Sequence, residues 1–318
     1  MPDLVTIGEA SAVFAAKKIG RMRYSSEFEL KPGGAEATVA VGVVRLGHSA
    51  GWVSKLGDDE LGHYILSLVK GEGVDVSQVS LSKEFQTAVF LRERLPKGAA
   101  RHFYYRKDSA FSNLHPEELD EEYVKSARII HLSGITPAVS PNCKQVVLRM
   151  IEIARLNKIP IVFDPNMRKK LWPAEEARAF FEQIYPQVDY VLPGIEDIEG
   201  LYGSGKQDLE VVDMLLDLGC RRVVLKCGAH GAIVGEPGKE PQWIEHEPIE
   251  APEDLMGAGD AFAAGFIAGV LEGLDLAASC RQGNEVARMA IQLPGNIEAM
   301  PTRFELELSR QGKKEIDR

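Results

Sequence analysis

The stretch Asp254-Leu-Met-Gly-Ala-Gly-Asp-Ala-Phe262 places two glycines and an aspartate directly before a run of small and apolar residues. Glycine lets the backbone approach a ligand closely, and a helix N-terminus presents unpaired N–H groups and a positive dipole end. Gly257, Ala258 and Gly259 therefore predict an anion hole, with Asp260 beside it as a proton acceptor. The same residues also suit a capped helix with close packing, so this stretch alone favours a binding site only modestly.

Two other phosphate-binding motifs are excluded by the residues themselves. Phe262 stands where a dinucleotide fingerprint needs its third glycine, and the stretch lies far from the first βαβ unit. The chain also has no Gly-x-x-x-x-Gly-Lys-Ser/Thr loop. The anion hole therefore has to belong to another fold.

Short apolar runs rich in β-branched residues alternate with longer helical patterns along the chain. This alternation predicts βαβ crossovers and a doubly wound α/β fold, in which helices cover both faces of a mostly parallel sheet. The expected strands are Leu4–Ile7, Gly51–Leu56, Ile129–Leu132, Pro160–Phe163, Tyr190–Leu192 and Val223–Leu225. The expected helices include Thr38–Leu46, Leu61–Lys70, Cys143–Leu156 and Glu175–Ile184.

Two segments, about 11–30 and 87–111, break this rhythm. Polar and apolar residues partly alternate there, as in half-exposed antiparallel strands, and Leu95–Ala99 can join two of them as a hairpin. We expect a small β-sheet that projects from the main domain as a lid. A fixed edge hairpin without a moving part is the alternative.

Composition and charge restrict the class of protein. The 318 residues, 45% hydrophobic and 26% charged, are those of an ordinary globular protein with one large α/β domain or two smaller ones. The formal charge of −10 gives no general reason to bind nucleic acid or an anionic membrane. Four scattered cysteines indicate a reducing compartment, and no leader or membrane-spanning run is visible, so we expect a cytoplasmic location.

Three motifs together carry a family resemblance. They are Gly33-Gly34 with the helix after it, Gly57-Asp58-Asp59-x-x-Gly62, and Gly257-Ala-Gly-Asp260. Their order and spacing resemble those of the ribokinase-like (PfkB) carbohydrate kinases from Leu4 to about Pro301. The resemblance implies one kinase domain over residues 1–310 with the lid segments inserted, a charged tail at 311–318, and the use of ATP and Mg²⁺.

Within that family the chain most resembles the kinases of 2-keto-3-deoxygluconate. Four stretches carry this likeness: Gly33-Gly-Ala-Glu36, Phe103–Ala110, His131–Pro137 and Asp164–Trp172. The chemistry agrees, because a keto-deoxy sugar acid carries a carboxylate for which Arg106 and Arg168 offer forked, charged donors. The substrate-side residues that the resemblance implies are Gly34, Phe90, Tyr104, Arg106, Arg168, Asp254 and Asn296. Phe90 stands where this group often has tyrosine, which removes one hydroxyl.

The resemblance also implies a nucleotide side. Val224-Leu-Lys-Cys-Gly-Ala-His-Gly231 is similar to the family's turn beside the phosphates and ribose. The implied ATP-binding residues are Asn166, Lys226, Gly228, Gly231 and Asn284. Asp197 can assist Mg²⁺ through water, although Gly194 replaces the asparagine of the family's Asn-x-x-Glu motif. Leu255-Met256 replaces a commoner threonine pair, so phosphate contacts there would use the backbone.

These observations predict transfer of the ATP γ-phosphate to 2-keto-3-deoxygluconate, with Asp260 as the base. A kinase for fructose, ribose or a nucleoside is the nearest alternative, and a non-catalytic sugar sensor is another. The expected partners are a small sugar acid and ATP, and the lid sheet could pair with that of a second copy.

Overall fold

The main sheet confirms the expected doubly wound arrangement. In this computed structural model, which describes residues 1–96, 100–246 and 252–312, a 9-stranded sheet has the order β13-β12-β11-β10-β9-β8-β1-β4-β5. Neighbouring strands from β5 to β11 are parallel, and β12 and β13 are added antiparallel at one edge. The strands are β1 (Leu4–Ile7), β4 (Ala50–Gly57), β5 (Val79–Ser82), β8 (Ile129–Ser133), β9 (Ile161–Asp164), β10 (Tyr190–Val191), β11 (Val223–Lys226), β12 (Ala232–Gly235) and β13 (Gln242–Ile244).

The six strands predicted from the sequence are all present, and their ends differ from the prediction by no more than one residue. β5, β12 and β13 were not predicted. β5 and β13 are short edge strands with partly exposed side chains, and β12, although buried, has only four residues and lies between Gly231 and a turn that begins after Gly235. An apolar run is a clear signal only where both faces of a strand are buried.

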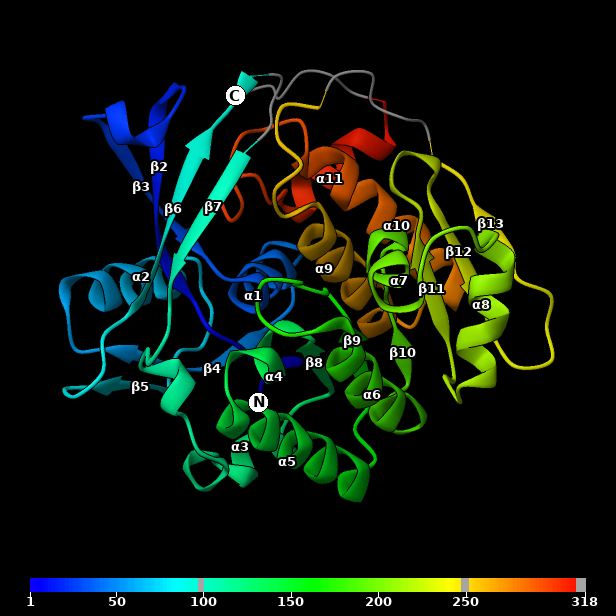
Figure 1. Cartoon of the computed structure of the whole chain (residues 1–318). Coiled ribbons are helices and arrows are strands. Elements are labelled where there is room, and N and C mark those ends of the chain that lie inside the picture. The colour runs from blue at the N-terminus through cyan, green and yellow to red at the C-terminus, as the bar shows by residue number, and fades with distance from the viewer. Residues whose placement is uncertain (97–99, 247–251, 313–318) are drawn as a thin grey trace.

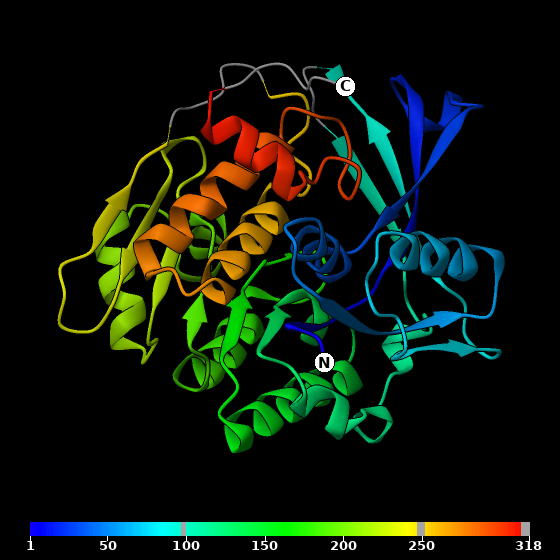
Figure 2. The same cartoon turned by 180° about the vertical axis from the view of Figure 1, so that it is seen from behind.

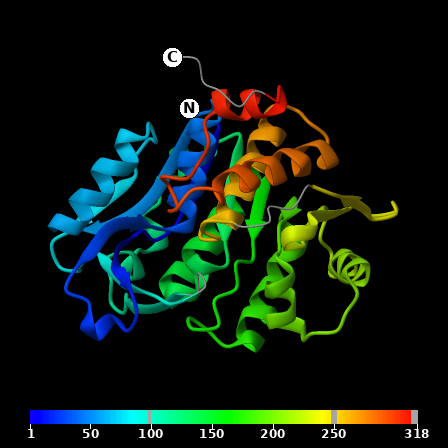
Figure 3. The same ribbon diagram turned by 90° about the horizontal axis from the view of Figure 1, so that it is seen from above.

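Helices cover both faces of the main sheet, as Figures 1 and 3 show. Alternate residues of β1 divide between the two cores: Val5 and Ile7 pack toward one, and Leu4 packs toward the other. The first core includes α5 (Pro141–Asn157), α6 (Ala174–Ile184), α7 (Ile195–Tyr202) and α8 (Asp208–Asp217). The second includes α1 (Ala35–Arg45), α2 (Glu60–Gly71), α9 (Ala258–Leu271) and α10 (Leu276–Ala290).

A second, four-stranded sheet stands away from the main one, with the order β3-β2-β6-β7 (Figure 1). β6 (Ala88–Arg94) and β7 (Ala100–Tyr105) form the predicted antiparallel hairpin. β2 (Ser11–Ile19) pairs antiparallel with β3 (Phe28–Gly33) but parallel with β6, so the sheet is mixed. Residues 97–99 of the predicted hairpin loop lie outside the described residues. We call this four-stranded sheet the lid sheet.

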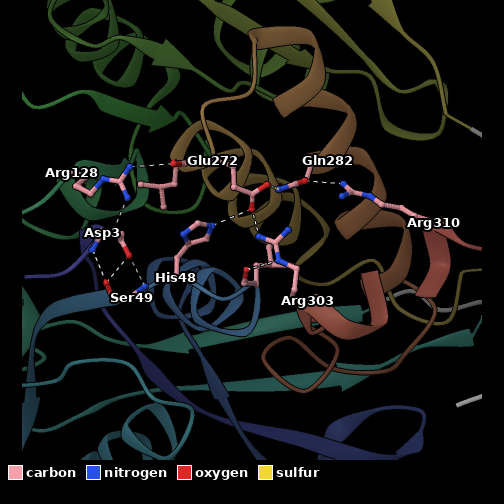
Figure 4. Close-up of polar contacts among 10 residues, drawn as sticks. Asp3, His48, Ser49, Arg128, Glu272, Gln282, Arg303 and Arg310 are labelled. Atoms are coloured by element: carbon pink, nitrogen blue, oxygen red, sulfur yellow. Dashed lines mark hydrogen bonds and ion pairs between the residues drawn. The ribbon is translucent and has the colours of Figure 1, made fainter. Parts of the chain in front are cut away.

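The C-terminal helix α11 (Arg303–Arg310) packs beside α9 and α10, as seen from behind in Figure 2. A polar network at the C-terminal end of α9 holds it there (Figure 4). Glu272 pairs with Arg303 and with His48 Nε2 at 3.2 Å, and Gln282 accepts a 2.8 Å bond from Arg310. Residues 313–318 of the predicted charged tail lie outside the described part of the chain.

The shorter elements complete the order. They are α3 (Glu121–Lys125), α4 (Ile135–Val139) and five described 3-10 turns within Met22–Tyr24, Phe111–Asn113, Pro116–Glu118, Tyr185–Gln187 and Gly228–His230. Over the described ranges, none of the helices combines the length and the apolar character that crossing a bilayer requires.

Candidate active site

The turn into α9 needs glycine for two separate reasons. Gly257 caps the helix in the left-handed region, with φ of 77°. A Cβ at this position would also lie 2.1 Å from Oδ1 of Asn296, so the asparagine amide fits against the glycine only because there is no side chain. The structure thus brings the predicted residues Gly257 and Asn296 together. The buried Asn296 Oδ1 accepts no hydrogen bond from the described residues.

Asp260 lies in the first turn of α9, and its side chain is partly buried. Desolvation of the carboxyl group, together with the charges of Asp164 and Glu36, raises the pKa of Asp260 to about 7. Arg168 and Lys226 act in the opposite direction. A carboxyl group with a pKa near neutrality can both accept and return a proton at pH 7.

An ion pair crosses the carboxyl ends of two parallel strands beside this helix. Lys226 Nζ, from the end of β11, lies 2.6 Å from Oδ2 of Asp164 at the end of β9. The same Nζ is 3.7 Å from the point where a Cβ on Gly259 would lie. The predicted lysine therefore adjoins the predicted anion hole. Asp164 belongs to a stretch named in the sequence analysis, but no role was predicted for it. The sequence does not show that the end of β9 lies beside the end of β11, where Lys226 is placed.

The carboxylate of Asp197 is engaged by backbone groups. Its oxygens accept N–H bonds from Gly194 at 2.8 Å and from Met167 at 2.6 Å, so it caps α7 and fixes the loop after β9. Burial raises its pKa, and the nearby Asp164 charge adds to the effect. In the described part of the chain, no three His, Cys, Asp or Glu side chains gather as a metal site. A role of Asp197 toward Mg²⁺ stays a prediction.

The predicted nucleotide turn folds as a tight glycine-dependent loop. Gly228 and Gly231 have φ of 58° and 99°, and a Cβ on Gly231 would meet the Ile244 carbonyl oxygen at 2.3 Å. Asn284 donates from Nδ2 to that carbonyl at 3.3 Å. A cavity of about 390 Å³ adjoins the loop and is lined by Ala229, His230, Trp243, Glu245 and His246. Its walls include an aromatic side chain, which suits a planar base.

Asn166 has a strained backbone conformation and lies between the proposed nucleotide side and the proposed substrate side. Its φ is 35°, and its N–H donates to Asp164 Oδ1 at 3.1 Å. Asparagine tolerates this left-handed region better than most residues. The loop from 165 to 170 therefore carries both Asn166 and Arg168 past the carboxyl end of β9 toward Asp260.

The lid sheet contributes aromatic and cationic groups. Phe90 and Tyr104 are paired across β6 and β7, with ring centroids 5.3 Å apart. The Arg106 guanidinium lies 5.9 Å from the Tyr104 ring centre and 2.5 Å from Oε2 of Glu9. Gly34 adjoins the same place, because a Cβ there would lie 2.9 Å from the Glu9 carbonyl oxygen.

Three charged residues at this site were not singled out from the sequence. Glu9 pairs with Arg106, Arg92 pairs with Asp254, and the fully buried Glu36 accepts bonds from Ser133 and Thr136 at 2.5 and 2.9 Å. Burial raises the pKa of Glu36. A signal existed for Glu36 alone, which follows the glycine pair inside the quoted Gly33-Gly-Ala-Glu36 motif.

Comparison with known proteins agrees with this geometry. The profile described as "pfkB family carbohydrate kinase" matches residues 1–303, so the chain belongs to the pfkB family of carbohydrate kinases. A 2-dehydro-3-deoxygluconokinase of Bacillus subtilis is 36% identical over 96% of this chain and 94% of its own length. A 5-dehydro-2-deoxygluconokinase of Clostridium perfringens is 29% identical over 94% and 90%. An Escherichia coli protein provisionally named ribokinase II, solved with ATP and Mg²⁺, superimposes with a TM-score of 0.89 at 25% identity over 98% and 100%.

Proposed function

We propose that this protein transfers the γ-phosphate of ATP to 2-keto-3-deoxygluconate, which is also called 2-dehydro-3-deoxygluconate, and releases 2-keto-3-deoxy-6-phosphogluconate. The observation that carries the proposal is the partly buried Asp260, with a pKa of about 7, at the N-terminus of α9 and within the field of Arg168. The Bacillus subtilis relative is named for this substrate. A base and a cation in one pocket suit a hydroxylated acid.

Asp260 acts as the proton acceptor in this proposal. Its ionised form takes the proton from the attacking hydroxyl, whose oxygen forms a bond to the γ-phosphorus while the bond to the β–γ bridging oxygen breaks. The N–H groups of Gly257, Ala258 and Gly259 hold the oxygens of the transferred group, and Lys226 adds positive charge beside them. The bridging oxygen leaves with ADP and keeps the electron pair of the broken bond.

The nucleotide and Mg²⁺ fit the residues present. The glycine-bounded loop at 228–231 and its cavity suit ribose and base, with Asn284 supporting the cavity wall and Asn166 near the phosphates. The carboxylates within reach are few, and an ion there would take most of its ligands from phosphate oxygens and water, as Mg²⁺ commonly does. When bound, the ion supplies charge that stabilises the transferring group.

The substrate carboxylate is assigned to the two predicted arginines. Arg168 lies toward Asp260, while Arg106 reaches from β7 and stays paired with Glu9. Phe90 and Tyr104 supply an apolar wall with one hydroxyl. Gly34 and Asn296 complete the substrate side, and the unbonded Asn296 Oδ1 offers an acceptor for a sugar hydroxyl.

A panel assay tests the proposal. ADP release is measured with 2-keto-3-deoxygluconate, 5-keto-2-deoxygluconate, fructose, ribose and a nucleoside as acceptors. We expect turnover of the first acid at the highest kcat/KM. Preference for the second acid would reassign the substrate to that of the Clostridium perfringens relative, and no ADP release with any acceptor would favour a sensor.

Substitution of Arg168 tests whether the substrate is an acid or a neutral sugar. We expect Arg168→Ala to lower kcat/KM for the keto-deoxy acid by about 30- to 100-fold, because a charge-assisted hydrogen bond contributes roughly 2–3 kcal/mol. Arg178→Ala, an exposed arginine on α6, is the matched control and should change little. An equal loss for fructose and for the acid would contradict the carboxylate assignment.

We also propose that residues 1–310 work as one kinase domain with the lid sheet inserted. The four cysteines are buried free thiols, which agrees with the predicted cytoplasmic location. Pairing of lid sheets between two copies stays a prediction.

A further inference from the structure

One face of the lid sheet is built in two rows. Residues opposite each other on antiparallel strands share a face, as do residues two apart on one strand. Phe90 opposite Tyr104 therefore forms one row, and Arg92 opposite His102 forms the next row toward the hairpin loop. The edge-to-face contact between His102 and Phe90, at 5.6 Å, confirms that the two rows adjoin. The first row is the proposed substrate wall, and the second has no role in the proposed reaction.

The second row binds the main domain. Arg92 Nη1 donates to Oδ2 of Asp254 and Nη2 donates to Oδ1, both at 3.0 Å. This forked pair is mostly buried, with side-chain exposures of 17% for Arg92 and 13% for Asp254. A paired arginine–carboxylate contact with this geometry is both stronger and more directional than a single surface ion pair.

Asp254 also binds the backbone of the turn that precedes α9. Its Oδ1 also accepts the N–H of Met256 at 3.1 Å, so one carboxylate links the lid strand to the residue directly before Gly257. Arg92 Nη1 additionally lies 4.0 Å from the Met256 sulfur. Both carboxylate oxygens of Asp254 are thus engaged by the protein. Binding of sugar hydroxyls by Asp254 stays a prediction.

A second, weaker contact runs in parallel. Lys31 on β3 lies 3.6 Å from Oε1 of Glu298, and Oε2 of Glu298 accepts the N–H of Asn296 at 3.1 Å. Asn296 is the residue whose amide fits against Gly257. The lid sheet therefore makes two separate contacts near Gly257. One acts through Asp254 on Met256, and the other acts through Glu298 on Asn296.

We propose that Arg92 is a positioning residue whose forked bond to Asp254 couples closure of the lid sheet to the shape of the Gly257 turn. The inference rests on the proposed function, because it assumes that this turn holds the transferred phosphate. When the lid sheet lies over the site, Asp254 is fixed and the N–H of Met256 is held. When it moves away, Asp254 loses its charged partner and the turn loses one constraint. Sugar binding under the lid and formation of the anion hole then become one event.

Steady-state kinetics of four variants test this coupling. We expect Arg92→Ala and Asp254→Asn each to raise KM for the sugar acid about tenfold and to lower kcat about tenfold. The double variant should be no worse than either single one, because both remove the same bond. Arg92→Lys should recover part of kcat, since it keeps the charge without the fork.

Arg94→Ala is the matched control. Arg94 lies two residues further along β6 and is exposed, and among the described residues its side chain bonds within the lid sheet, to the Lys17 carbonyl oxygen at 3.4 Å. We expect its kinetics to stay within twofold of the unmodified enzyme. Kinetics of Arg92→Ala equal to those of Arg94→Ala would overturn the proposal, as would single effects that multiply in the double variant.

Hydrogen exchange separates this inference from the proposed function, because it needs no turnover. Arg92→Ala should speed exchange of the Met256 amide at least severalfold while circular dichroism and melting temperature stay those of a folded protein. If the unmodified protein phosphorylates no sugar acid but the Met256 amide still responds to Arg92, the substrate assignment fails and the coupling stands. An unchanged amide in a folded Arg92→Ala or Arg92→Lys variant would refute the coupling.

Discussion

The two ends of helix α9 carry buried charge in opposite ways. At the C-terminal end, partial burial acts to raise the pKa of Glu272, but bonds from Arg303 and His48 outweigh it, and the pKa is lowered (Figure 4). At the N-terminal end, about 21 Å away for a helix of 14 residues, burial raises the pKa of Asp260 to about 7. The first carboxylate is stabilised in its charged form, whereas the second is destabilised.

The contrast separates a structural charge from a chemical one. Glu272 contacts His48 in the loop after α1, Gln282 of α10 and Arg303 of α11, and so ties the C-terminal helix to the domain. Within the described part of the chain no side chain donates a hydrogen bond to Asp260, and its neighbours include the like charges of Asp164 and Glu36. A carboxylate that must take up a proton is useful only if its charge is not already satisfied.

Breaking the N-terminal end should have the largest effect on activity. We expect Asp260→Asn to lower kcat by about 10²- to 10⁴-fold, the range that a general base contributes, while substrate binding and the fold persist. In the unmodified enzyme kcat/KM should rise with pH through about 7, as Asp260 ionises. Single-turnover phosphate transfer and calorimetric binding of the sugar acid check both points, and near-normal turnover would show that another group is the base.

The same substitution should increase stability. The pKa of Asp260 is higher folded than its ordinary value of 3.8, so the folded state binds more protons between about pH 4 and 7 and loses stability as pH rises through that window. Asparagine does not titrate, and Asp260→Asn should therefore be more stable by a few kcal/mol at pH 8 and by less at pH 5. Denaturant unfolding at both pH values measures this.

An exposed carboxylate provides the comparison for that experiment. Asp213→Asn, on the outer face of α8, should show no such pH-dependent gain. A loss of stability for Asp260→Asn at pH 8 would mean that the ionised carboxylate is satisfied in the fold, contrary to the contrast between the two ends.

Breaking the C-terminal end should have the smallest effect. Arg303→Ala removes the contact to Glu272 and a 2.9 Å bond to the Leu46 carbonyl oxygen. We expect a loss of about 1 kcal/mol, typical for partly exposed pairs, and a fall in Tm of about 2–4 °C. kcat should stay within twofold at 25 °C. A large loss of kcat in the folded variant would show that the two ends are not independent.

The layered fold and the candidate residues of the site could be predicted from the sequence. Buried parallel strands are continuous apolar runs, so six of them could be located to within one residue. Gly34, Gly257 and Gly231 could be recognised because each position needs a positive φ or has no room for a Cβ. Both requirements favour glycine, which is visible in the sequence. Arg106 and Arg168 could be proposed as substrate-binding residues because a guanidinium group suits a carboxylate.

Only the tertiary structure decided which charges meet. Arg92 and Asp254 are 162 positions apart, and Lys226 and Asp164 are 62 apart. Nothing in the local sequence distinguishes these residues from solvated surface charges, because a salt bridge depends on where strands and loops end in space. The same holds for the pKa of Asp260, which is set by burial and by charged groups from three other parts of the chain, namely Glu36, the segment 164–168 and Lys226. The sequence placed a carboxylate at the helix N-terminus, and the packing around it raised the pKa of that carboxylate to about 7, as the proposed base requires.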